Sequence, residues 1–296
     1  MSRPLAAIGG CATSAIAAEF CRTGHEYNVS LAVSVTTQRE TQMKLALKIL
    51  CIAVLLAGAV VASTGSPVSH CGKTRLFRRH GVVFWSTSGR YRAIFYRSGF
   101  AIDADGAFRA YHPGDYLGLD ALVHAGHPGN WWALVTENQK RNGRPVVQGD
   151  DDPAPGYYVS TTALYDPDNP KVRDPRRYVN AEEIPYIVLH PQALHFARLG
   201  DFATVVNLQN GKTAGAIVAD ESTASVRVGE GSIALANELG IDSDPRFGGK
   251  AKGVAYVVYP HSGNGRPRDL AEILDNSEQL FEAWGGLEKL TTCSAE

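Results

Sequence analysis

The fold is decided by the stretch LGDFATVVNLQNGKTAGAIVADESTASVRVGEGSIALANELG, which occupies residues 199–240. Two β-rich runs flank Asn210-Gly211, and this pair favours a type I′ hairpin turn, in which both central positions need a positive φ. The hairpin delivers Asp220 to the end of its second strand. Farther along, Ser232 is expected to cap a short helix that stops at the closing glycine.

A second carboxylate, Glu230, stands at the entrance of that helix within Gly229-Glu230-Gly231-Ser232. Two acids that rigid elements hold in place, with glycines leaving room for a bulky ligand, are typical of the carboxylate pair of a glycosidase. The stretch therefore predicts a site for glycoside hydrolysis at Asp220 and Glu230.

The N-terminal part of the chain has the pattern of a targeting segment. MKLALKILCIAVLLAGAVVAS, from Met43 onward, joins two lysines, an apolar run and small residues, which predicts a secretory signal peptide cleaved after Ala62. An uncleaved membrane anchor is the alternative, although the apolar run is short for one. We expect residues 1–42 to be an upstream extension from a wrongly assigned start, residues 43–62 the signal peptide and residues 63–296 a single domain.

The charge balance and the predicted export bound the function classes. Five of the 29 basic residues and three of the 30 acidic residues lie in residues 1–62, so the remainder has a net charge of −3. This mild balance argues against nucleic-acid binding, which usually leaves a basic footprint. We expect a secreted monomer without stable membrane association after cleavage, extracellular or, in a Gram-negative bacterium, periplasmic.

Cysteine placement agrees with export. Cys11, Cys21 and Cys51 fall in the excluded segment, and Cys71 and Cys293 flank the rest of the chain. In an oxidising compartment a disulfide between these two would tie the ends of the domain together, and two free thiols are the alternative. No set of His and Cys has ligand spacing, so the sequence predicts neither a metal site nor a cofactor.

Between those two cysteines the chain has many short β-type runs, with helices few and late. The runs are expected at residues 82–85, 91–96, 131–136, 157–164, 184–189 and 254–259. Asp269 and Glu272 have the spacing of a capping box at the start of an amphipathic helix, which Gly285-Gly286 would end. This order predicts a mainly β (α+β) domain with a few peripheral helices.

Two further groups of residues are candidates for ligand contact. Asp103 and Asp105 alternate along an extended segment and so face the same side, either as a polar turn or as a substrate-facing acidic pair. An EF-hand is excluded, because no glutamate closes the loop. Trp131 and Trp132 would point to opposite faces of a strand, so one is expected in the core and the other free to stack on a sugar ring.

These residues resemble those of glycoside hydrolase family 75, the endo-chitosanases first described from fungi. The matching stretches are AIDADGAFRAYHP, PGNWWALVT, VVQGDDDPAPGYYVSTTAL, IPYIVL, LGDFATVVNLQNGKTAGAIVAD, GEGSIALANELGI, YVVYPHSGNGRPR and LFEAWGGLEKL, which cover nearly all of residues 72–293. In that family the Asp that ends the AIVAD-type strand and the Glu of the GEGS-type turn are catalytic, and they fall on Asp220 and Glu230. The fungal enzymes carry an extra cysteine in the D-x-D region where Ala104 stands, so no local disulfide is expected there.

The same stretch is similar to the double-psi β-barrel of rare lipoprotein A and the expansins. In that pattern a strand-end Asp precedes a second acid and S-x-x-A-x-x-L-G, as Asp220 precedes Glu230 here. The resemblance implies a six-stranded double-psi-like β-barrel core.

The family resemblance implies an inverting endo-hydrolysis of β-1,4 bonds in chitosan. Inversion needs a general acid and a general base, for which we expect Glu230 and Asp220, respectively. The opposite assignment stays open, because Ser232 and the helix N-terminus would favour the charged form of a nearby acid.

Chitosan is a polycation, so acidic groups that line the cleft would attract it. Asp103, Asp105 and Asp120 are the candidates, with a solvated turn residue as the alternative for Asp120. Two other functions stay open: cleavage of peptidoglycan, and noncatalytic binding of cell-wall polysaccharide by an expansin-like barrel.

Overall fold

A computed structural model of the chain describes residues 71–222 and 228–295. The predicted upstream extension, 1–42, and signal peptide, 43–62, lie outside these residues. All of the described residues fall in one unit of the fold, which begins at Val68. No helix in the part of the chain that the structure describes is long and apolar enough to cross a membrane.

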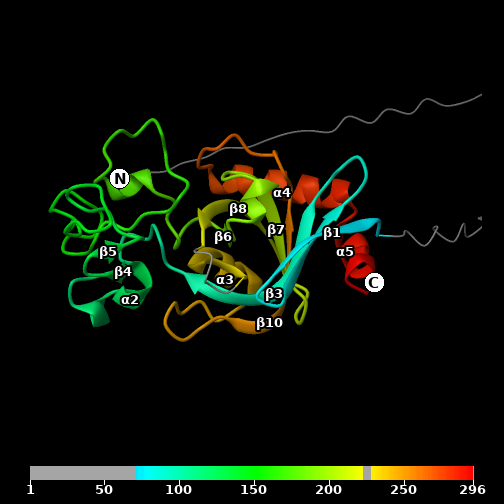
Figure 1. Ribbon diagram of the computed structural model, residues 1–296, viewed down its shortest axis with the longest axis horizontal. Helices are drawn as coiled ribbons and strands as arrows, with labels where there is room; N and C mark the ends of the chain where they lie inside the picture. Colours follow the sequence, from blue (N-terminus) through cyan, green and yellow to red (C-terminus); the bar gives the residue numbers. More distant parts are fainter. Residues whose placement is uncertain (1–70, 223–227, 296) are drawn as a thin grey trace, which may run out of the picture. The chain divides into compact units, whose positions relative to one another are not determined.

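Six strands close a β-barrel in the order β3-β10-β7-β8-β6-β9, and β9 pairs back with β3 (Figure 1). The strands are β3 (Ile94–Asp103), β6 (Tyr186–Leu189), β7 (Phe202–Asn207), β8 (Thr213–Glu221), β9 (Glu230–Ser232) and β10 (Lys250–Val258). The pairs β3–β9 and β6–β8 are parallel, and the other four are antiparallel. The prediction of a mainly β fold with a six-stranded barrel core is confirmed.

A hairpin, a few helices and one long connection surround the barrel. The hairpin of β1 (Lys73–Arg79) and β2 (Val82–Thr87) extends the sheet from β3. The helices are α2 (Leu122–Ala125), α3 (Ile233–Leu239), α4 (Leu270–Trp284) and α5 (Gly286–Ala295), with 3₁₀ turns at Asp115–Leu117, Pro175–Arg177 and Ala193–His195. Residues 104–183 form the long connection, whose β4 (Gly126–His127) and β5 (Asn130–Trp131) make a separate small ladder.

Alternate residues of the barrel strands enter two different apolar clusters, as the period of two in a strand requires. One cluster fills the barrel and includes Tyr96, Val205, Val218, Tyr256 and, from α3, Leu235. The other lies outside the wall, where Ile217 and Ala219 of β8 join Ile273 and Phe281 of α4. Helix α4 therefore covers the β7–β8 side of the barrel (Figure 1).

The central hairpin is confirmed as β7–β8, but the predicted type I′ turn is wrong. Five residues, 208–212, connect the strands, and only Gly211 of the Asn-Gly pair has a positive φ, 75°. The Asn210 side chain explains the difference, because its Oδ1 accepts from the Lys212 amide and its Nδ2 donates to the Leu239 carbonyl. The asparagine thus joins the hairpin to the end of α3.

The predicted strands over 131–136 and 157–164 are wrong as continuous strands. The long connection pairs with itself through isolated bridges, among them Leu134 with Ser160 and Thr136 with Pro145. Prolines and glycines interrupt the run between these bridges, and proline has no N–H to donate to a ladder. The connection is therefore an irregular cap beside the barrel.

The predicted cap at the start of α3 is confirmed, and the predicted capping box at the start of α4 is not. Ser232 Oγ accepts from the Leu235 amide at 3.1 Å, and Gly240 ends the helix in the left-handed conformation. The predicted capping box at Asp269 is wrong: the Asp269 side chain makes no capping bond, and Glu272 pairs with Arg268 instead.

Cys71 and Cys293 form a disulfide with a Cα–Cα distance of 4.9 Å. Beside it, the Lys73 Nζ donates to the Cys293 carbonyl at 2.9 Å. The bond thus joins the start of the described domain, before β1, to α5 at its end.

Candidate active site

Strand β6 brings Asp220 and Glu230 together. Val188 of β6 pairs with Asp220 on the parallel strand β8 and with Glu230 on the antiparallel strand β9. The two acids therefore stand on either side of one valine, although nine residues of the chain, 221–229, separate them.

Register also fixes the face from which both acids project. Directly paired residues of neighbouring strands point to the same side of a sheet, and Val188 belongs to the cluster outside the barrel. Two interstrand spacings put the backbones of Asp220 and Glu230 roughly 10 Å apart.

Strand β3 and the turn that follows it add two more carboxylates, Asp103 and Asp105. Ala101 pairs with Glu230, so Asp103, two residues along β3, faces the same side as Glu230. Asp103 ends the strand, and its Oδ1 accepts from the Asp105 amide at 2.9 Å in the turn that follows. One carboxylate oxygen from each of Asp103, Asp105 and Asp220 lies within 4.8 Å of the others.

The long connection supplies a donor to Asp220. The Asp220 Oδ1 accepts from the Ala163 amide at 3.1 Å and from the Glu221 amide at 2.7 Å. Glu230, in contrast, accepts no hydrogen bond from the described residues. The two acids of the predicted pair therefore have different environments.

Two tyrosines that the sequence analysis missed hold Asp105. The Tyr111 hydroxyl donates to the Asp105 Oδ1 at 2.7 Å, and the Tyr186 hydroxyl donates to the Asp105 carbonyl at 2.9 Å. Tyr111 lies in the irregular connection and Tyr186 in an apolar strand, so neither carries a local sequence signal for this role.

Burial is the main cause of raised pKa values throughout the cluster. It raises the pKa of Asp103 to about 6, against a usual value near 3.8, although the Asp105 amide and the Tyr186 hydroxyl favour the charged form. Burial, followed by the charge of Asp103, holds the pKa of Asp220 and of Glu230 well above the usual range. The pKa of Asp105 rises for the same two reasons. Together these shifts favour a site that keeps protons near neutral pH.

Other predicted contact residues have structural partners. Asp120 is buried, and its carboxylate accepts from the Ala121 amide and bonds the His124 Nδ1, so it is not the solvated turn residue of the alternative interpretation. Trp131 is a core side chain of the outer cluster, which excludes it from sugar stacking. Trp132 is 39% exposed, and its Nε1 donates a hydrogen bond to the His124 carbonyl.

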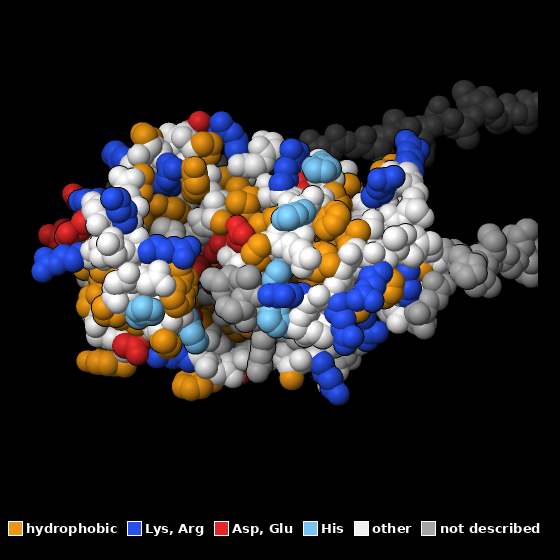
Figure 2. Space-filling view, in the orientation of Figure 1, with side chains coloured by type: hydrophobic (Ala, Val, Ile, Leu, Met, Phe, Trp, Pro, Cys, Tyr) orange, Lys and Arg blue, Asp and Glu red, His pale blue; other side chains and the backbone are white. Residues whose placement is uncertain are grey.

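The acidic side chains gather in a hollow between residues 104–183 and the barrel (Figure 2). Asp103 and Asp220 are 7% and 9% exposed, and Asp105 and Glu230 are half-buried. The acids are thus at the base of a cleft and not on an open face.

The three clustered aspartates also have the chemistry of a divalent-cation site. Asp103, Asp105 and Asp220 offer only oxygen, which suits Mg²⁺ or Ca²⁺ and not zinc. The sequence analysis expected no metal because it searched for His and Cys at short spacing, and Asp220 joins this cluster only through the barrel.

No protein-family model matches the chain, and no curated protein is significantly similar to it.

Proposed function

We propose that the protein is a secreted endo-chitosanase that hydrolyses β-1,4 bonds with inversion, as its resemblance to glycoside hydrolase family 75 implies. The observation that carries the proposal is the placement of Asp220 and Glu230 on either side of Val188, facing one cleft. Inverting glycosidases hold their two carboxyl groups roughly 6.5 to 9.5 Å apart, so that a water molecule fits beside the sugar.

In the proposed reaction Glu230 is the general acid and Asp220 the general base. Burial and nearby negative charge raise the pKa of Glu230, which favours its protonated form, and in the proposed reaction it gives this proton to the leaving glycosidic oxygen. Burial, followed by the charge of Asp103, raises the pKa of Asp220 as well, but the amides of Ala163 and Glu221 offset part of that rise by favouring its carboxylate. In the proposed reaction this carboxylate takes a proton from the attacking water. Water attacks from the face opposite the leaving group, which inverts the anomeric carbon.

The helix start does not reverse this assignment. Ser232 Oγ accepts from the amides of Leu235 and Tyr186, and Glu230 accepts no hydrogen bond from the described residues, the Ser232 hydroxyl included. The helix it caps has seven residues, Ile233–Leu239, and begins three positions after Glu230.

The remaining carboxylates fit a cationic polymer. Asp103 and Asp105 lie next to the catalytic pair, and Asp120 is close enough to raise the pKa of Glu230 through its charge. A glucosamine unit brings an ammonium group that offsets the mutual repulsion of these acids. An N-acetylated unit brings no such charge, so the cleft favours deacetylated substrate.

The test is hydrolysis by the purified full chain of chitosan, chitin and peptidoglycan, with reducing ends as the readout. We expect activity on chitosan and an α-anomeric first product by NMR. Activity on peptidoglycan alone, or none on chitosan, would contradict the proposal, and binding without new reducing ends would indicate a noncatalytic module.

Variants test the residues separately from the function. Asp220→Asn and Glu230→Gln should each lower chitosan hydrolysis by about 10²- to 10⁴-fold, the usual contribution of a general acid or base. Glu278→Gln, at an exposed position of α4, is the matched control and should retain full activity. Activity should also survive EDTA, because the proposed steps use only protons and water.

A further inference from the structure

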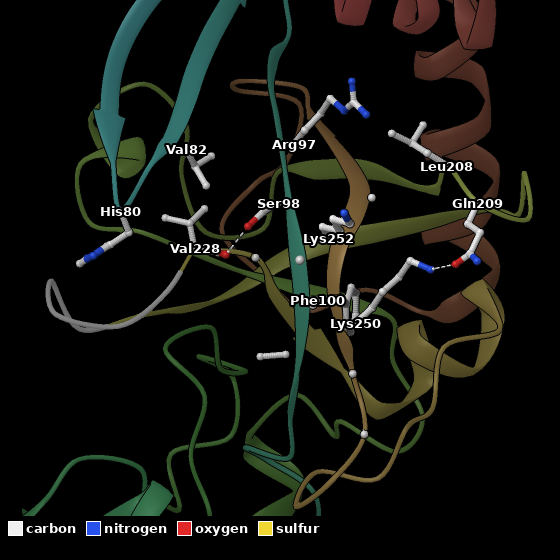
Figure 3. Close-up of a pocket in the computed structure, with 17 residues that line it drawn as sticks. His80, Val82, Arg97, Ser98, Phe100, Leu208, Gln209, Val228, Lys250 and Lys252 are labelled. Carbon is white, nitrogen blue, oxygen red and sulfur yellow. Dashed lines mark hydrogen bonds between the residues drawn. The ribbon is translucent and has the colours of Figure 1, made fainter.

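The proposed active site does not involve a pocket of about 1260 Å³ between β3, β10 and the turn of the β1–β2 hairpin (Figure 3). Its basic side chains are His80, Arg97, Lys250 and Lys252, and we call it the basic pocket. Among the described residues that line it there is no Asp or Glu. The volume exceeds the roughly 300 to 1,000 Å³ of ordinary small-ligand sites, which indicates room for a segment of a chain.

A bulge in β10 creates this pocket. Lys250 pairs with Phe100 and Val254 pairs with Ser98, so three residues of β10 oppose a single residue of β3. Gly253 accommodates the bend with a φ of 87°. The bulge lifts Lys252 out of the sheet and sets it near Lys250, whose Nζ donates to the Gln209 amide oxygen (Figure 3). Bulges of this kind re-aim side chains at functional sites.

Two cationic side chains of the pocket have no acidic partner among the described residues. Arg97 and Lys252 are exposed and form no ion pair with other described residues. The sequence from Cys71 to Ile102 contains seven Lys or Arg and neither Asp nor Glu, so the whole hairpin beside the pocket is basic. In Figure 2, Lys and Arg side chains lie over the region where Figure 1 draws β1 and β2, and Asp and Glu side chains lie in the hollow. The sequence analysis gave this charge no role.

The other lining groups suit hydroxyl groups rather than bases. The Gln209 amide and the polar backbone of residues 248–253 can bond hydroxyls, and the glycines there allow close approach. Phe100 of the lining is buried, so the exposed ring of the described lining is the His80 imidazole. The described lining has no exposed Phe, Tyr or Trp side chain on which successive bases of a nucleic acid could stack. Chitosan is excluded as a ligand, because its ammonium groups would meet Arg97 and both lysines.

We propose that the basic pocket binds a linear acidic polysaccharide, with sugar carboxylates on Arg97, Lys250 and Lys252. This inference is independent of the proposed hydrolysis, since the pocket and the acid cluster share no residue. Such a site would bind the protein to an anionic wall polymer while the acidic cleft binds and hydrolyses a cationic one.

The test is binding of the purified full chain to polygalacturonate by isothermal titration, with dextran as the neutral polymer and polyphosphate as the non-sugar polyanion. Binding to polygalacturonate should weaken steeply as salt screens the charges, and dextran should not bind. An affinity for dextran equal to that for polygalacturonate, or tighter binding of polyphosphate at equal charge, would overturn the assignment.

A pair of charge-matched variants locates the site. Arg97→Gln with Lys252→Gln should weaken polygalacturonate binding at least tenfold and leave chitosan hydrolysis unchanged. The control, Lys140→Gln with Arg141→Gln, removes the same charge from exposed positions of the long connection and should change the affinity less than twofold. Equal weakening by both pairs, or no binding by the unmodified protein, would refute the proposal.

Discussion

Asp220 and Glu230 differ in what surrounds their oxygens, and this difference can be read out chemically. Two backbone N–H groups donate to Asp220, whereas Glu230 accepts no hydrogen bond from the described residues and lies near other carboxylates. A general acid is needed only when the leaving group must be protonated, and a general base is needed whatever leaves. Substrates with good leaving groups therefore distinguish the two roles.

We predict that Glu230→Gln hydrolyses a glucosamine oligomer with a dinitrophenol leaving group within roughly tenfold of the unmodified rate, because dinitrophenolate departs without a proton. Asp220→Asn should lose activity on this substrate and on chitosan alike. Release of dinitrophenol measures both. If Asp220→Asn keeps activity on this substrate and Glu230→Gln loses it, Asp220 is the general acid and Glu230 the general base. The same two residues would then still form the catalytic pair.

Asp103 gives a pH-dependent prediction about stability. Its pKa is about 6 in the folded protein and near 3.8 when unfolded, so the folded state binds more protons between these values. Ionisation therefore opposes folding: the penalty is absent below about pH 4 and grows as pH rises to about 6. Two pKa units correspond to a penalty on the order of 3 kcal/mol.

We predict that Asp103→Asn raises the free energy of unfolding at pH 7 by up to about 3 kcal/mol and changes it little at pH 4, where Asp103 is already neutral. The asparagine oxygen can still accept from the Asp105 amide. Urea unfolding at both pH values measures the effect. Glu278→Gln serves as the control, and a gain of equal size at both pH values would count against the titration of Asp103.

Among the elements, β9 and α3 are joined by one buried hydroxyl. Ser232 is fully buried, and its Oγ accepts from the Leu235 amide within α3 and from the Tyr186 amide of β6. Removing it leaves two buried N–H groups without their acceptor. The same change loosens the strand that carries Glu230.

We predict that Ser232→Ala lowers the free energy of unfolding by about 2 kcal/mol and lowers chitosan hydrolysis, because the register of β9 positions Glu230. Ser232→Thr keeps the oxygen and should recover most of the loss. Denaturant unfolding and reducing-end release measure the two effects. An alanine variant as stable as the unmodified protein would show that these hydrogen bonds contribute nothing net.

Local chemistry explains which elements could be predicted. The Ser232 cap, the Gly240 stop and the β7–β8 hairpin each depend on neighbours in sequence, and all three are present. The prediction of a type I′ turn is wrong because the Asn210 side chain bonds to Leu239, which is 29 residues away. The prediction of a strand at 131–136 is wrong because this segment pairs only through isolated bridges within a loop-rich connection.

At the scale of the whole molecule, the predictable part of the site is the pair of acids, and barrel closure supplies the rest. Asp103 reaches Glu230 through the β3–β9 pairing, and the donor to Asp220 comes from Ala163 in the long connection. Tyr111 and Tyr186 meet at Asp105 from two other segments. None of these contacts has a spacing that a sequence pattern could reveal, whereas the motif resemblance points directly to Asp220 and Glu230 as the proposed pair.

The ends of the folded domain depend on one covalent bond. Cys71 precedes β1, Cys293 lies in α5, and 222 residues separate them. A crosslink around so long a loop strongly restricts the unfolded chain. Chain-entropy models put the resulting stabilisation at about 5 kcal/mol, and removal of a native disulfide typically costs about 2 to 5 kcal/mol. The β1–β2 hairpin pairs only with β3 at the edge of the sheet, so this bond also holds the basic hairpin in place.

We predict that Cys71→Ala with Cys293→Ala lowers the free energy of unfolding by about 2 to 5 kcal/mol, and that β1, β2 and α5 lose amide protection first, because the bond joins those elements directly. Denaturant unfolding and hydrogen exchange measure the two effects. Reductant should lower the stability of the unmodified protein to that of the variant and leave the variant unchanged. If reductant destabilises both equally, its effect does not act through this disulfide; if the barrel strands exchange as fast as the hairpin, the bond supports the whole fold and not only its ends.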